Sequence, residues 1–224
     1  MSSNKFQHPD PAAYDNWYDT PRGQWIGNTE LDLVNRLLQA QAGEKLLDVG
    51  CGTGWFTRRY AQHAGLAVTG VDVDAPSLAY ARSKDAATSY LQADACALPF
   101  AANHFERVVS MTALCFVEDW PQAIREIVRV ARSRFVVGVL NLNSALYHAK
   151  GRNGGEGAYR GAYWHTTEEL QYALAGMDVC GVAFHSAIFA PSGTRVARVL
   201  ERALPNECLW GGCLIASGNI KSRP

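Results

Sequence analysis

The chain has 224 residues, of which 48% are hydrophobic and 19% are charged. These values are typical of a globular domain and exclude a collagen-like, coiled-coil or disordered protein. The 21 basic residues balance the 21 acidic ones. This balance argues against a general nucleic-acid binder, which draws its affinity from a basic excess. We expect one folded domain and no nucleic-acid partner.

The predicted elements alternate short apolar runs with helical patterns, between two stretches expected to be irregular: residues 1–27 and the glycine-rich residues 149–161. The predicted strands are residues 45–49, 66–73, 88–92, 107–112 and 134–140, followed by the apolar runs 179–189 and 208–217. The predicted helices are residues 28–42, 55–63, 75–83, 121–131 and 166–175. No helical pattern is expected between the last two runs, so we predict an antiparallel pair at the sheet edge.

Four of these helices have a candidate N-cap residue, whose side chain accepts from a free N–H of the first turn. The candidates are Thr29, Asp74, Asp119 and Thr166, the last with Glu169 in a capping box. Gly43 is predicted to stop the first helix. The whole pattern indicates an α/β fold, a mostly parallel sheet with helices on both faces. Residues 1–27 are predicted to be an aromatic lid segment, and residues 28–224 the single domain.

The cysteine pattern and the N-terminal sequence lead us to expect a cytoplasmic protein. No stretch approaches the roughly 18 apolar residues of a membrane span, and the N-terminus has no signal-peptide core. The six cysteines show no zinc spacing, so no metal is expected. Four lie in apolar runs and are expected to be buried free thiols: Cys115, Cys180, Cys208 and Cys213.

Ligands of such folds bind beyond the carboxyl ends of the strands. The first predicted strand runs into the sequence DVGCGTG, residues 48–54, whose three alternating glycines permit a tight turn and close approach to a ligand. It is neither a Walker loop nor the dinucleotide pattern, because no Gly-Lys-Ser/Thr follows and the third glycine comes one residue early. A glycine turn without a ligand is the alternative reading.

Acidic residues follow the next two strands. Asp72 ends the second, where a nucleotide-binding domain hydrogen-bonds ribose hydroxyls, and Asp74 is better placed to cap the next helix. Asp94 follows the third strand, where a carboxylate can accept from an exocyclic amine and the neighbouring N–H can reach a ring nitrogen. Taken alone, each could equally be a cap or turn residue.

Together these segments resemble the motifs of the class I S-adenosylmethionine (SAM) dependent methyltransferases. The residues are LLDVGCGTG (46–54), GVD (70–72), ADACALPF (93–100) and FERVVS (105–110). The pattern is similar to that of the type 11 group, which includes quinone-biosynthesis C-methyltransferases, and YDNWYDTPRG (14–23) resembles the entry segment of that group. The clear match covers about residues 14–140.

The resemblance implies a Rossmann-like seven-stranded sheet with the last strand antiparallel, and SAM as cofactor with S-adenosylhomocysteine (SAH) as product. The cofactor-binding residues that it implies are Asp48, Gly50, Cys51, Gly52, Gly54, Asp72, Val73, Asp94, Ala95, Met111, Thr112 and Phe116. The glycines would pass beneath the methionine part and ribose. Asp72 would accept from the ribose hydroxyls, and Asp94 from the adenine amine. Methyl transfer then needs alignment more than a fixed catalytic triad.

The acceptor site is expected from the aromatic N-terminus and from an insertion at residues 141–165. The candidate pocket residues are Tyr14, Trp17, Tyr18, Tyr159, Arg160, Tyr163 and Trp164. His148 and His165 are candidate general bases, since histidine exchanges protons near neutral pH. Each could instead serve packing alone.

The leading hypothesis is therefore methyl transfer to a small molecule at C, O or N, by a monomer or a homodimer. No Asn/Asp-Pro-Pro-Tyr/Phe motif follows the fourth strand, which argues against a nucleic-acid substrate. A non-catalytic SAM-binding sensor or partner subunit is one alternative. Another is the same fold with an aminopropyl donor or a nicotinamide dinucleotide.

Overall fold

The computed structural model describes residues 10–62 and 65–221. Its centre is a seven-stranded sheet of order β3-β2-β1-β4-β5-β7-β6. The strands are β1 (Lys45–Val49), β2 (Ala67–Asp72), β3 (Ser89–Gln92), β4 (Phe105–Met111), β5 (Ala131–Leu140), β6 (Val179–Ala187) and β7 (Cys213–Ile220). The first five pair in parallel, and β7 pairs antiparallel with both β5 and β6. The predicted fold class and the antiparallel edge pair are confirmed.

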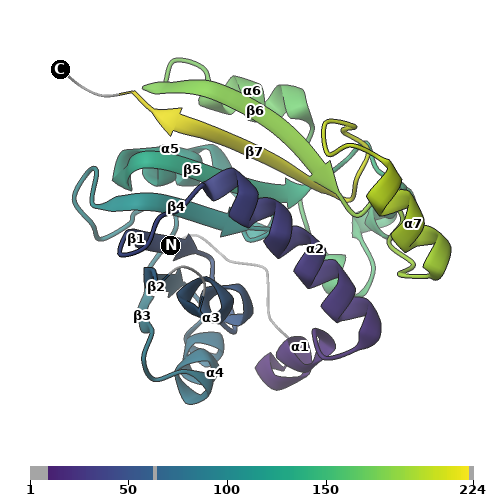
Figure 1. The fold of residues 1–224 in the computed structure, drawn as a ribbon, viewed down its shortest axis with the longest axis horizontal. Helices are drawn as coiled ribbons and strands as arrows, with labels where there is room; N and C mark the ends of the chain where they lie inside the picture. The colour runs from purple at the N-terminus through teal and green to yellow at the C-terminus, as the bar shows by residue number, and fades with distance from the viewer. Residues whose placement is uncertain (1–9, 63–64, 222–224) are drawn as a thin grey trace.

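Helices cover both faces of the sheet. They are α1 (Pro11–Trp17), α2 (Pro21–Leu38), α3 (Trp55–Gln62), α4 (Ala75–Lys84), α5 (Trp120–Val130), α6 (Thr167–Leu174) and α7 (Arg195–Ala203). Figure 1 shows α2 lying across the near side of the sheet, with α5 and α6 behind it. In the part of the chain that the structure describes, no helix is both long and apolar enough to cross a bilayer.

The strands supply side chains to two cores because successive residues of a strand face opposite ways. In β1, Leu46 joins the core under α2 and α3, whereas Leu47 joins the core under α5 and α6. Val108 and Val109 of β4 divide in the same way. Burial on both faces explains why the central strands β1, β4 and β5 carry apolar runs without alternation.

The first helical region differs from its prediction. Residues 10–27 form α1 and the start of α2, so the expected irregular structure is wrong there, and residues 1–9 lie outside the described residues. Thr20, not Thr29, caps α2, since its hydroxyl accepts from the N–H of Gly23 at 3.0 Å. Thr29 lies inside the helix, and α2 ends before Gly43, at Gln39 in the left-handed conformation. The predicted boundary after residue 27 therefore falls within α2.

The second half of the chain differs from its prediction in three respects. α7 lies between β6 and β7, where no helix was expected. Residues 147–159 form short turns of π- and 3-10 helix. Among the cysteines expected to be buried, Cys115 and Cys213 are, but Cys180 is exposed and Cys208 half-buried. Cys180 lies on the edge strand β6, next to a break in its register with β7.

The remaining caps are confirmed. Asp74 accepts from the N–H of Ser77 at 3.0 Å, and Asp119 from that of Gln122 at 3.2 Å. Thr166 and Glu169 form the predicted capping box.

Candidate functional site

A cavity lies where β1, β2, β3 and β4 end. It is lined by residues 49–53 after β1, 71–74 after β2, 93–95 after β3, and 111–114 after β4. Its other wall is aromatic, from Tyr14, Tyr18, Trp55, Phe56 and Phe116, with Val117 beside them. The four sequence motifs therefore meet at one place, as expected for the carboxyl edge of parallel strands.

The loop after β1 depends on its glycines. Gly50, Gly52 and Gly54 have φ of 76°, 53° and 77°, in the left-handed region that favours glycine. The N–H groups of Gly50 and Cys51 both donate to the Val71 carbonyl, at 2.8 and 2.9 Å. A Cβ on Gly50 would lie 2.1 Å from the Cβ of Ala113. No side chain fits at this position, so the backbone itself forms the cavity floor.

Asp72 is held in a fixed orientation beside this loop. Its Oδ2 accepts from the N–H of Gly52 at 2.7 Å, and its Oδ1 from the N–H of Asp74 at 2.9 Å. A carboxylate has about four acceptor sites. The two backbone bonds fix the carboxylate of Asp72 at the edge of the cavity, and two carboxylate oxygens match the spacing of two vicinal hydroxyls.

Asp48 and Gly54 do not line the cavity but pack against the elements around the loop that forms it. Asp48 is buried, accepts from the hydroxyl of Thr57 at 2.6 Å, and has a pKa raised to about 7, mainly by burial and further by the charge of Asp72. Gly54 faces α4 and β3, where a Cβ would lie 2.7 Å from the hydroxyl of Tyr90. Burial also raises the pKa of the Cys51 thiol well above its usual value, so this thiol is neutral at pH 7.

The two remaining strand ends add polar and apolar surface. The carboxylate of Asp94 accepts from the N–H of Cys96 at 2.8 Å, which orders the turn containing Ala95. Beside them, Val73 after β2 adds an apolar side chain that is 44% exposed. Thr112 has φ of 55° and donates its N–H to Gly138 at 2.8 Å. A β-branched residue in this conformation stores strain of about 1–3 kcal/mol, a feature that concentrates at functional sites.

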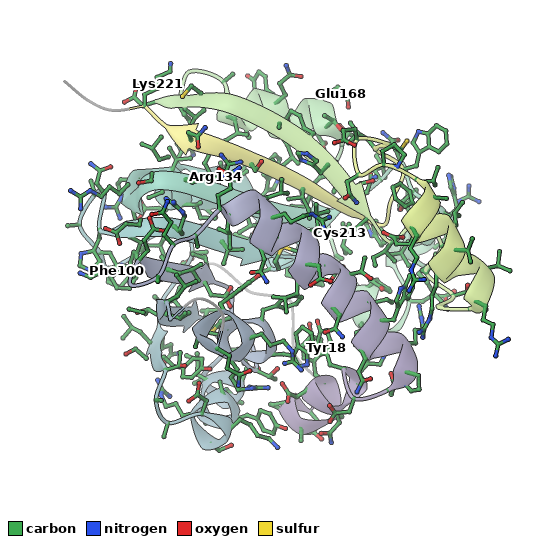
Figure 2. The ribbon with its side chains drawn as sticks, viewed as in Figure 1. Tyr18, Phe100, Arg134, Glu168, Cys213 and Lys221 are labelled. Atoms are coloured by element: carbon green, nitrogen blue, oxygen red, sulfur yellow. The ribbon has the colours of Figure 1, made fainter. Side chains whose placement is uncertain are left out.

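Two of the predicted acceptor residues reach the cavity. Tyr18 lies at the junction of α1 and α2 (Figure 2) and stacks on Trp55, with ring centroids 4.2 Å apart. Tyr14 packs edge-on against Tyr18 at 5.9 Å. Burial raises the pKa of both phenols, and the Tyr18 hydroxyl donates a hydrogen bond to that of Tyr14, so both hydroxyls stay protonated at neutral pH.

The other acceptor candidates lie outside the cavity lining, as do both candidate bases. Trp17 packs against Tyr18 at 4.9 Å. Trp164 contacts Tyr159 at 5.6 Å, within the 141–165 segment. The exposed side chains are those of Arg160 and Tyr163.

The histidines have structural partners of their own. His165 is 2% exposed and packs against Trp120 with ring centroids 4.6 Å apart. Burial lowers its pKa, so the ring is neutral at pH 7. His148 Nδ1 lies 2.7 Å from Arg152 Nη2.

Several lining residues were missed in the sequence analysis. They are Val49, Thr53, Trp55, Phe56, Val71, Asp74, Ala93, Ala113, Leu114 and Val117. All of them lie within two residues of a predicted site residue, so their position beside the motifs was the available signal. Within the described residues, no group of three or more His, Cys, Asp or Glu side chains is placed to hold a metal ion.

Comparison with known proteins agrees with this geometry. Residues 47–136 match the type 11 family described as "Methyltransferase domain". An uncharacterized protein of Mycobacterium tuberculosis is 32% identical over 189 residues, which are 82% of this chain and 63% of that protein. The malonyl-[acyl-carrier protein] O-methyltransferase of Pectobacterium atrosepticum is 39% identical over 106 residues, covering 47% of this chain and 42% of that enzyme. The chain thus spans less than two thirds of the length of these relatives.

A solved structure from Thermotoga maritima supports the fold. It is described as a SAM-dependent methyltransferase, possible histamine N-methyltransferase, and superposes with a TM-score of 0.74 at 22% identity. The superposition covers 94% of this chain and 96% of that one. Residues 47–136 thus match the type 11 methyltransferase domain, and the fold of the described chain is that of a solved SAM-dependent methyltransferase.

Proposed function

We propose that this protein transfers the methyl group of SAM to a small-molecule acceptor and releases SAH. The observation that carries the proposal is the shared cavity of the glycine loop and the oriented carboxylate of Asp72. A loop whose floor admits no Cβ suits close approach of a ligand, and an oriented carboxylate at the end of the second strand suits a ribose.

The cofactor residues have the following proposed roles. The loop of residues 50–54 carries the methionine part and ribose, and Asp72 accepts from both ribose hydroxyls. Val73 packs on the adenine, Asp94 accepts from its amine, and the N–H of Ala95 donates to a ring nitrogen. Met111 and Thr112 lie beside the sulfonium, and Phe116 covers the site. Asp48 acts indirectly, by holding the start of α3 through Thr57.

The chain's contribution to the chemistry is alignment and exclusion of water. When bound, SAM supplies a methyl group whose bond to sulfur breaks with both electrons going to sulfur, as the acceptor's electron pair forms the new bond. The cavity wall of Tyr14, Tyr18, Trp55 and Phe56 holds the acceptor in line and keeps water out. The hydroxyls of Tyr14 and Tyr18, which hydrogen-bond to each other, give this wall a polar group that orients the acceptor.

The acceptor class stays open at this level. One relative is named as an O-methyltransferase acting on a carrier-bound malonyl group, and the structural neighbour as a possible N-methyltransferase, so carbon, oxygen and nitrogen acceptors remain candidates. Enzyme names among the relatives favour methyl transfer over a non-catalytic sensor. The cytoplasmic location, the oligomeric state and the lack of a nucleic-acid partner stay predictions.

Calorimetric titration with SAH and SAM tests the cofactor assignment. Wild-type protein should bind both, and Asp72→Ala should weaken SAH binding about tenfold or more, a loss of about 1.4 kcal/mol. Asp32→Ala is the matched control, because Asp32 is an exposed carboxylate on α2 that does not line the cavity. Failure of the wild-type protein to bind either ligand would refute the proposed function, and equal effects of the two variants would refute the role of Asp72.

A further inference from the structure

One buried carboxylate near the cavity has no role in the function proposed above. Asp15 lies in the middle of α1 and is 8% exposed. Its Oδ1 accepts from the hydroxyl of Thr53 at 2.8 Å. Nη2 of Arg58 lies 2.9 Å from each of its two oxygens. Asp15 thus joins α1 to the glycine loop and to α3.

The same arginine also holds the loop backbone. Arg58 Nη1 donates to the Thr53 carbonyl at 2.7 Å, and Thr53 is 1% exposed and lines the cavity. Three groups from three segments therefore form a closed set of contacts: the α1 carboxylate, the loop threonine and the α3 guanidinium. Moving the loop at Thr53 stretches two hydrogen bonds that end on Asp15 or Arg58.

Helix α1 depends on such contacts to keep its position. It has seven residues, and isolated helices shorter than about 12–15 residues are marginal in water. Besides its contacts with α4 and the packing of Trp17 on the core under α2, two residues tie it to the segment that follows β1. They are Asp15 and Tyr18, the residue directly after the helix, which stacks on Trp55 of α3. The position of α1 therefore depends in part on the glycine loop and the start of α3.

The helix in turn carries one wall of the cavity. Tyr14 precedes Asp15 directly, Tyr18 follows it by three residues, and both tyrosines line the cavity. A buried ion pair adds little net stability, because the cost of desolvating both charges offsets their attraction. Separating the two partners is costly, however, because it leaves a buried charge without its partner. Such a contact transmits a change at the loop to the helix instead of absorbing it.

We propose that Asp15 is a positioning residue that, through Thr53 and Arg58, couples cofactor binding at the glycine loop to the placement of Tyr14 and Tyr18. The acceptor wall then forms when the cofactor is bound, so the cofactor binds first and the acceptor second. By linkage, α1 tightens cofactor binding by the same factor by which the cofactor orders α1. This proposal rests on the proposed function and adds an order of binding and a residue that enforces it.

Hydrogen–deuterium exchange of the full chain, with and without saturating SAH, tests the coupling. In the wild-type protein, SAH should slow exchange about tenfold, within the usual range of coupling between sites, in peptides covering residues 50–58 and residues 11–18. In Asp15→Asn, the effect at residues 50–58 should remain and the effect at residues 11–18 should be lost. The Kd for SAH should rise about five- to tenfold in the same variant.

Two further variants separate coupling from general destabilisation. Glu44→Gln weakens another largely buried pair, in which Arg107 Nη2 and Glu44 Oε1 lie 3.1 Å apart near the start of β1. It should keep both SAH effects. Thr53→Val leaves the Asp15–Arg58 pair and the bond from Arg58 to the residue 53 carbonyl intact, and removes the hydroxyl that links Asp15 directly to the loop. It should weaken the SAH effect at residues 11–18 even if Asp15→Asn fails to fold.

The outcomes distinguish this proposal from the one it rests on. Failure of wild-type protein to bind SAH refutes the proposed function and the coupling together. Binding of SAH with no change at residues 11–18 refutes the coupling alone. The coupling is also refuted if Thr53→Val retains the full SAH effect at residues 11–18, or if Glu44→Gln abolishes that effect.

Discussion

Replacing Gly50 with alanine should lower the stability of the fold and weaken cofactor binding. The loss of stability has two parts, one from the backbone conformation and one from a steric clash. Gly50 has φ of 76°, and its Cβ would lie 2.1 Å from the Cβ of Ala113, whereas apolar carbons pack at about 3.5–4.0 Å. An L-residue in the left-handed conformation costs about 1–2 kcal/mol. Overpacking of a filled site costs about 1–3 kcal/mol more. Gly50→Ala should therefore lower the free energy of unfolding by about 2–5 kcal/mol.

Comparison with Gly43→Ala isolates the cost of overpacking from the cost of the backbone conformation. Gly43 has φ of 81°, close to that of Gly50, but a Cβ there would meet no atom within 4 Å. This variant should lose only the conformational cost of about 1–2 kcal/mol. The entropy that alanine removes from the unfolded chain is the same in both variants, so it cancels in their difference. That difference, about 1–3 kcal/mol, is the cost of the contact with Ala113.

Urea denaturation and SAH titration of the two variants provide the measurement. Gly50→Ala must shift the loop that carries the cofactor, so its Kd for SAH should rise about tenfold or more, equivalent to 1.4 kcal/mol. Gly43 lies before β1, away from the cavity, and its variant should bind SAH as the wild-type protein does. Equal stability losses would refute the steric argument. Unchanged SAH affinity in Gly50→Ala would show that the loop does not contact the cofactor.

Two further predictions concern stability. Burial raises the pKa of Glu30 from 4.5 to about 8, and the charge of Glu201 adds to the rise. Between these two pH values the folded state holds a proton that the unfolded chain has released. The free energy of unfolding should therefore fall as pH rises from 4.5 to 8. Glu30→Gln should flatten this decline, worth about 1.4 kcal/mol per pKa unit, in urea midpoints measured at pH 5 and pH 8, and an unchanged slope would contradict the assignment. Tyr18→Ala should cost about 3–5 kcal/mol, because the ring is buried against Trp55. Tyr163→Ala should stay within about 0.5 kcal/mol, since that side chain is 42% exposed, and similar losses in urea would contradict the burial argument.

The elements that sequence analysis located well are those with strong local signals. All seven predicted strands overlap β1 to β7, and the five predicted helices overlap α2 to α6. A strand buried on both faces is a continuous apolar run, and a capped helix carries its own start signal, as Asp74 and Asp119 do. Both signals lie within a few residues and need no knowledge of the fold.

The elements that were missed have weak local signals. The first turns of α2 pack through glycines: a Cβ on Gly27 would lie 2.6 Å from the Trp55 ring, so the missing side chain, not an apolar one, makes the contact. Helix α7 buries only Ala197 among its nine residues, while Val196 and Val199 are exposed. Its apolar residues therefore do not mark a face toward the core. In both cases the stabilising surface belongs to another segment, which a local pattern does not reveal.

For the candidate site, the sequence by itself predicted the residues at the strand ends that line the cavity. Glycines at positions 50, 52 and 54 and the carboxylate at Asp72 follow from backbone conformation and strand order, which are readable in a short motif. The tertiary structure alone decided which aromatic residues face the cavity. Tyr14 and Tyr18 line it because Asp15 meets Arg58, 43 residues away in the chain, whereas Tyr163 and Trp164 are held outside the lining. Contacts between segments so distant in sequence depend on how the helices pack, and no periodicity in the chain encodes them.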